Sequence, residues 1–97
     1  MVIAVARISL HLPASQSLKD KRQIVKSLLA QVQRQFGVAA AEVDHHDRLQ
    51  LGVLGLACVS TDAGHADSVL AHAVDFLGSS RHGADLLDYQ TEVMHVF

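Results

Sequence analysis

Apolar residues occupy every second position from Val2 to Leu12, and the positions between them hold a mixture of apolar, polar and charged residues. Side chains of a β-strand alternate between its two faces, so this pattern predicts a strand that buries one face. Pro13 follows directly and has no backbone N–H, which ends the pairing of the strand. At 97 residues, 49% hydrophobic and 19% charged, the chain is typical of one globular domain covering residues 1–97.

The next segment has the pattern of an amphipathic helix. Ser17 and Asp20 form an S-x-x-D start signal, and Gly37 is placed to end the helix. Between them, apolar residues recur at intervals of three and four, as the buried stripe of a helix requires. These residues are Leu18, Ile24, Val25, Leu28, Leu29, Val32 and Phe36.

Two further segments, Val38–Asp44 and Leu49–Ser60, are rich in residues that favour strands. The short polar segment His45-His46-Asp47-Arg48 between them has the length of a hairpin connection, so the two strands are predicted to pair antiparallel. Gly52 and Gly55 interrupt the second strand and predict a bulge or a close approach of the backbone.

The last third of the chain predicts a second helix and a final strand. Thr61 or Asp62 can cap the helix, and Gly78-Ser79-Ser80 ends it. The strand covers about Leu86 to Val96, where Leu87, Tyr89, Thr91 and Val93 alternate with polar residues.

The order strand, helix, strand, strand, helix, strand predicts an α+β fold of the ferredoxin-like βαββαβ type. Right-handed crossovers give a four-stranded antiparallel sheet of order 4-1-3-2 with both helices on one face. The other face stays uncovered, and Ile3 and Val5 lie on it beside Arg7. Exposed apolar area in a small domain favours association, so we expect a homodimer formed through these residues.

Other features of the chain exclude several classes of protein. Cys58 is the single cysteine, so an intrachain disulfide is impossible and a reducing cytoplasm is the expected location. The first residues lack the basic region and cleavage site of a signal peptide. The longest apolar candidate, Leu49–Val59, is about half the ~20 residues of a membrane-spanning helix, so no membrane association is expected.

Four motifs in order resemble the YlxP-like family of small bacterial proteins, a domain of unknown function. They are Ser17-Leu18-Lys19-Asp20-Lys21-Arg22, Ala41-Glu42-Val43-Asp44-His45, Val59-Ser60-Thr61-Asp62 and Leu86-Leu87-Asp88-Tyr89. The resemblance implies a ferredoxin-like fold and no established catalytic residue. Genes of the family commonly lie among those for transcription termination, translation initiation and ribosome maturation, which implies a role near RNA or the ribosome. Where the family often has Trp-Gln-Arg, this chain has Leu49-Gln50-Leu51.

Five of the eight Lys and Arg residues fall on the first predicted helix, although the net charge of the chain is −2. Lys19, Lys21 and Arg22 lie in its first turn, where the helix dipole disfavours cations. This conflict, together with free N–H groups, predicts an anion site, and Lys26 extends it into a candidate RNA- or ribosome-binding surface. The alternative is an ordinary solvated face neutralised by Asp20 and other acidic residues. Residues 51–56 carry no aromatic side chain, so contact with phosphates is expected in place of base stacking.

Metal binding and catalysis have less support. Asp44-His45-His46-Asp47 contains four residues of metal-ligand type, but neighbouring residues of a strand point to opposite faces, so we expect no physiological metal. Cys58 is predicted to be a core thiol without an activating base. We therefore expect a binding protein without a cofactor or catalytic site. The alternative is a homo-oligomeric structural or small-ligand module that uses the uncovered sheet face.

Overall fold

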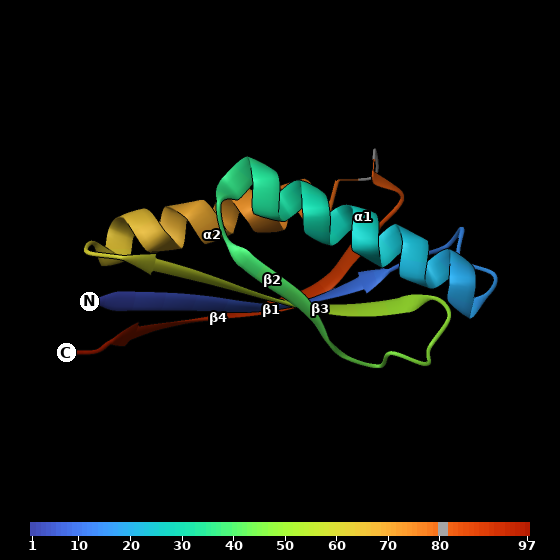
Figure 1. Cartoon of the computed structure of the whole chain (residues 1–97), viewed down its shortest axis with the longest axis horizontal. Helices are drawn as coiled ribbons and strands as arrows, with labels where there is room; N and C mark the ends of the chain where they lie inside the picture. The colour runs from blue at the N-terminus through green and yellow to red at the C-terminus, as the bar shows by residue number, and fades with distance from the viewer. Residues whose placement is uncertain (80–81) are drawn as a thin grey trace.

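The computed structural model describes residues 1–79 and 82–97. In these residues the elements are β1 (Val2–His11), α1 (Leu18–Phe36), β2 (Ala39–Asp44), β3 (Leu51–Ser60), α2 (Ala63–Leu77) and β4 (Asp85–His95). The strands form one antiparallel sheet of order β2-β3-β1-β4, which is the predicted order counted from the other edge. Both helices lie on one face of the sheet (Figure 1). The ferredoxin-like α+β prediction is confirmed.

The hydrophobic core fills the space between the sheet and the helices. Every second residue of β1, from Val2 to Leu10, is buried, as the alternation predicts. Leu28 and Val32 of α1 and Leu70 of α2 pack onto these residues. The area that such side chains remove from water supplies the main favourable term for folding.

The predicted ends of the helices are confirmed by their capping contacts. The Ser17 hydroxyl accepts a hydrogen bond from the backbone N–H of Asp20 at 3.0 Å, and Gly37 adopts a left-handed conformation with φ 66°. Asp62 caps α2, because its Oδ1 accepts from the N–H of Gly64 at 2.9 Å. The helix ends at Leu77; of the predicted Gly78-Ser79-Ser80 stop, Ser80 lies outside the described residues.

The irregularity predicted at Gly52 and Gly55 lies in the neighbouring strand. Pairing passes from Glu42 opposite Leu54 to Asp44 opposite Val53, so β2 carries a bulge at Val43. A Cβ atom on Gly55 would lie 2.8 Å from Cγ1 of Val43, so this position requires a glycine for the predicted close approach. The bulge reverses the usual alternation, and Glu42 and Asp44 point to opposite faces of the sheet.

The hairpin between β2 and β3 is also longer than predicted. Leu49 and Gln50 belong to the connection, which therefore covers residues 45–50.

Within the described residues, no helix is both long and apolar enough to cross a membrane.

Candidate nucleic-acid interface and the open sheet face

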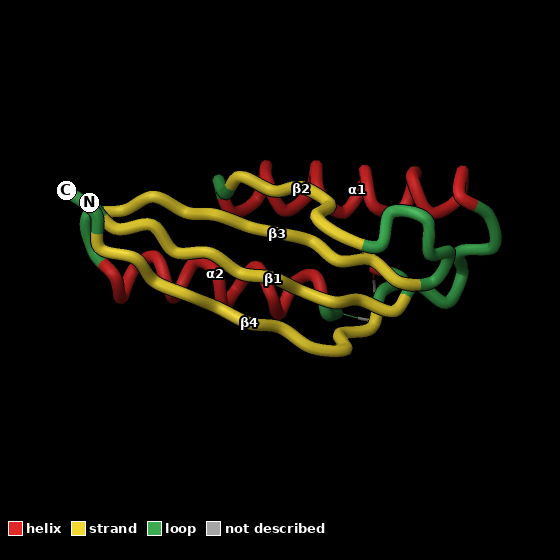
Figure 2. The backbone as a smooth tube through the Cα atoms, turned by 90° about the horizontal axis from the view of Figure 1, so that it is seen from below, coloured by secondary structure: helices red, strands yellow, loops and turns green. Residues whose placement is uncertain are grey.

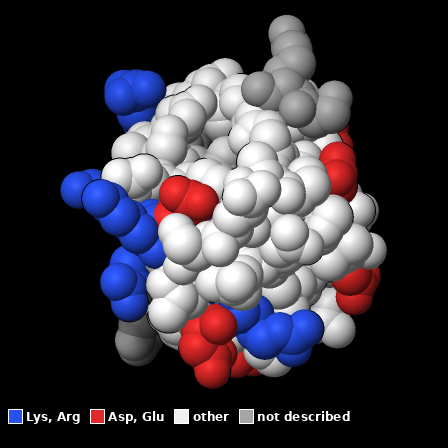
Figure 3. Space-filling view, turned by 90° about the vertical axis from the view of Figure 1, so that its right-hand side faces the viewer, with Lys and Arg blue, Asp and Glu red and all other residues white. Residues whose placement is uncertain are grey.

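The predicted nucleic-acid site is divided between two sides of α1. Lys19, Arg22 and Lys26 are exposed, and at 100° per residue they lie within about 60° of one another around the helix axis. We call these three residues the basic stripe. Figure 3 looks onto the end of the molecule where α1 begins and shows several Lys and Arg side chains along one edge, with a further basic group beside Asp and Glu side chains lower down.

Lys21 lies on the inner side of the helix, so the structure corrects its predicted role as a nucleic-acid contact. Its side chain is only 1% exposed, and its Nζ lies 3.1 Å from Oε2 of Glu42. The same ammonium group donates a hydrogen bond to the backbone carbonyl of His45. Lys21 therefore connects the first turn of α1 to β2 and the hairpin, and it is not available to a ligand.

The start of α1 is also less open to an anion than predicted. Ser17 already satisfies the N–H of Asp20, and the Asp20 carboxylate accepts from the N–H of Gln16 at 3.3 Å. This carboxylate supplies the negative charge that the helix N-terminus favours. The basic stripe, and not a cradle of free N–H groups, is therefore the remaining feature of the predicted site.

A hollow of about 360 Å³ runs between the basic stripe and β2. Arg22, Lys26, Gln33 and Glu42 line it, together with apolar side chains of α1. Glu42 is the acidic residue in this lining, and its charge is met by Lys21. In the part of the chain that the structure describes, no ion pair involves a residue of the basic stripe.

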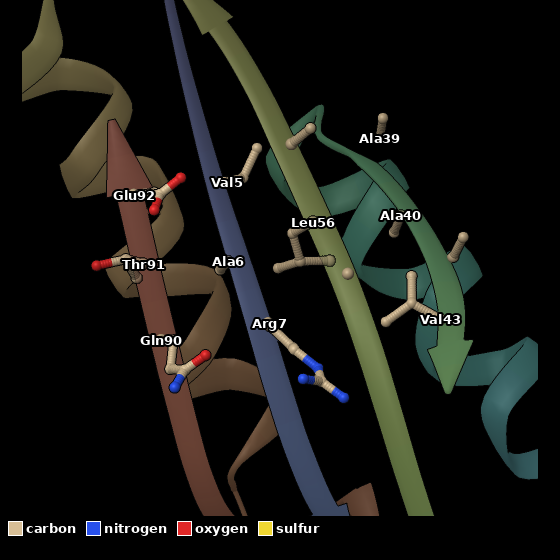
Figure 4. Close-up of a pocket in the computed structure, with 13 residues that line it drawn as sticks. Val5, Ala6, Arg7, Ala39, Ala40, Val43, Leu56, Gln90, Thr91 and Glu92 are labelled. Atoms are coloured by element: carbon tan, nitrogen blue, oxygen red, sulfur yellow. The ribbon is translucent and has the colours of Figure 1, made fainter. Parts of the chain in front are cut away.

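The sheet face opposite the helices is open (Figure 2). Ile3, Val5 and Arg7 lie on this face, as predicted. A groove of about 590 Å³ lies on it. Figure 4 looks onto this groove and shows the Arg7 side chain pointing from β1 towards β3. Small and apolar residues form much of its lining, namely Val5, Ala39, Ala41, Val43, Gly55 and Ala57, while Arg7, Gln90 and Glu92 add polar groups.

Arg7 and Asp44 form an ion pair beside this groove. One guanidinium nitrogen donates to Oδ2 of Asp44 at 2.8 Å, and the two side chains are 54% and 47% exposed. The backbone N–H of His45, 2.8 Å from Oδ1, lowers the pKa of Asp44 below its usual value, and the charges of His45 and Arg7 add to this effect.

The four residues of metal-ligand type in the hairpin do not converge. Nε2 of His45 lies 3.9 Å from Oδ2 of Asp44, whereas Nε2 of His46 lies 3.2 Å from the carbonyl of Glu42. Among the described residues, no group of three or more His, Cys, Asp or Glu side chains could hold a metal ion. Cys58 is half-buried and packs against the core.

Comparisons with known proteins agree with the resemblance in the sequence. A fragment of 63 residues, covering 65% of this chain and 68% of the other, is 33% identical to the uncharacterized protein YlxP of Bacillus subtilis (strain 168). Among solved structures, SnoaB, a cofactor-independent oxygenase from Streptomyces nogalater, is similar over 98% of this chain and 91% of its own, with a TM-score of 0.45 and 15% identity. A likeness of this degree carries no information on activity. The family described as protein of unknown function DUF503 matches residues 3–91, and the chain belongs to this family.

Proposed function

We propose that this protein binds RNA, free or within ribosomal particles, by contact of the basic stripe with backbone phosphates. The observation that carries the proposal is the exposure of Lys19, Arg22 and Lys26 on one side of α1 with no ion-pair partner among the described residues. Over seven residues of helix the stripe is about 10 Å long, which suits several phosphates of one strand.

The distribution of charge supports the same proposal. Six of the ten Asp and Glu residues lie after residue 60, but only one of the eight Lys and Arg residues does. A basic side on a chain of net charge −2 attracts a polyanion locally, while the acidic remainder opposes general adhesion.

The role of Lys21 adds a physical reason for the free charges of the stripe. Glu42 borders the same hollow as Arg22 and Lys26 and could otherwise pair with them. The buried ammonium group of Lys21 forms an ion pair with Glu42 on the inner side of α1. Arg22 and Lys26 are therefore left unpaired by Glu42 and can bind an external anion.

The absence of aromatic side chains from the central strands favours binding through phosphates over base stacking. β1 and β3 hold no Phe, Tyr or Trp, so the central strands offer no ring on which a base could stack. Binding through phosphates alone has low sequence specificity and depends strongly on salt.

Titration of structured RNA and of ribosomal subunits into the full chain at several salt concentrations tests this proposal. Three phosphate contacts predict a log-log salt slope of about −2 to −3. Arg22→Gln with Lys26→Gln removes two of the three contacts, so the slope falls to about −1 and the affinity drops more than tenfold at low salt.

Arg34→Gln with Arg48→Gln is the matched control, because it changes the net charge equally at exposed positions outside the stripe. We expect this variant to bind within threefold of the original chain. Equal losses in both double variants, or no binding of the original chain near 50 mM salt, would contradict the proposal.

A further inference from the structure

We propose that a second copy of this chain covers the open sheet face, and that an apolar ridge of each copy enters the groove of the other. The ridge consists of Ile3, Val59 and Met94, which lie side by side on three neighbouring strands. Val59 is 67% exposed and Met94 40% exposed, so two of its three side chains are accessible to a partner. This inference does not depend on RNA binding, because the basic stripe lies on α1, on the other side of the sheet.

The groove has the shape that such a ridge requires. Its lining includes Gly55, Ala57 and Ala41, where the side chains are absent or consist of one methyl group. The ridge and Gly55 lie on the same face, four residues apart along β3, which is about 13 Å. A protruding row and a hollow row on one face are the elements of a self-complementary, two-fold interface.

The proposed two-fold axis is the one that brings the ridge of each copy towards the groove of the other. An axis that runs across the strands at the level of Val5 reverses the strand direction and keeps the lateral order of the strands. It places Val59 of one copy over Gly55 of the other, because these residues are equally far from Val5 in the register. Val59, the most exposed side chain of the ridge, then packs against the Val43 side chain that lies over Gly55.

The charged groups that line the groove differ in how well they tolerate burial. Arg7 and Asp44 already neutralise each other at 2.8 Å. Glu92 lies opposite Val5 on β4, so the axis brings the two copies of Glu92 towards each other at the edge of the interface. Like charges at this position weaken the dimer, and their removal is expected to strengthen it.

The area of the face matches a specific interface of modest strength. β1, β3 and β4 contribute 10, 10 and 11 residues and β2 contributes 6. At about 3.3 Å per residue and about 4.8 Å between strands, the face measures roughly 600 Å² per copy. The total of roughly 1,200 Å² is at the lower limit of specific protein interfaces, so the dimer is expected to dissociate on dilution.

Sedimentation velocity and light scattering of the full chain over a wide concentration range test the inference. We expect a concentration-dependent shift from monomer to dimer mass. Val59→Asp places a charge on the ridge at an exposed position, so it should retain the folded circular dichroism spectrum and weaken dimerisation at least tenfold. Glu92→Gln should strengthen dimerisation severalfold.

Val93→Asp is the matched control, because Val93 lies on the helix-facing side of the same sheet and is 37% exposed. It should leave dimerisation unchanged. A mass that stays monomeric up to roughly 0.5 mM overturns the inference and leaves the groove to another occupant, such as a small apolar ligand. A dimer that tolerates Val59→Asp also overturns it, because the contact then lies elsewhere.

Discussion

Strand β2 carries two carboxylates, two residues apart, that pair with cations on opposite faces of the sheet. Glu42 points towards the helices and meets Lys21, whose side chain is 1% exposed, whereas Asp44 points to the open face and meets Arg7, which is 54% exposed. The bulge at Val43 creates this difference, because without it both acids would share a face. The same kind of contact is therefore expected to be structural where it is buried and replaceable where water reaches it.

The largest effect is expected from breaking the buried pair. Lys21→Met leaves the Glu42 carboxylate, 17% exposed, without its cation, so the free energy of unfolding should fall by about 3 kcal/mol. Urea unfolding followed by circular dichroism measures this loss. Lys19→Met is the control on the exposed side of the same turn and should change stability by less than about 0.5 kcal/mol.

A double variant separates the ion pair from the hydrogen bond that Lys21 makes to the hairpin. Lys21→Met with Glu42→Gln removes both charges, and most of the lost stability should return. If the double variant is as unstable as Lys21→Met alone, the hydrogen bond of Lys21 to the His45 carbonyl, and not the ion pair, is the important contact.

The two ion pairs also show which features of the structure could not be predicted from the sequence. Alternation along Val2–Leu12 and the capping signals at Ser17 and Gly37 are local, and they gave the strand, the helix and the open face correctly. Lys21 has the same residue type as Lys19, and its burial depends on an acid 21 residues later in the chain. Glu42 faces α1 because of the register in which β2 pairs with β3, and the residue types around it do not specify that register.

A smaller effect is expected from disturbing the bulge. Gly55→Ala places a Cβ atom 2.8 Å from Val43, so either the side chain of Val43 or the bulge must shift, at a cost of about 1 to 2 kcal/mol. The same urea unfolding experiment measures it. Val43→Ala in the same chain should restore part of the loss, and a failure to do so would show that the backbone of β3 requires glycine for another reason.

The exposed pair is expected to contribute less than either of these. Arg7→Met should lower the free energy of unfolding by less than about 1 kcal/mol, because water and salt screen both partners. Unfolding at low protein concentration, in low and high salt, measures it. The difference between the two chains should shrink as salt is added, and a loss close to that of Lys21→Met would remove the distinction between the pairs.

The smallest effect concerns the protonation of Asp44. Its pKa lies below the ordinary value of 3.8, so the folded chain binds this proton less readily than the unfolded chain does. The resulting stability is present above pH 3.8 and is lost as the pH falls through the lower pKa of the folded state. An NMR titration of the Asp44 carboxyl carbon measures that pKa directly. Because the His45 N–H is the main cause and Arg7 a lesser one, Arg7→Met should raise the pKa only part of the way to its ordinary value. Full recovery in this variant would make the ion pair, and not the backbone of the hairpin, the group that holds Asp44 in its charged form.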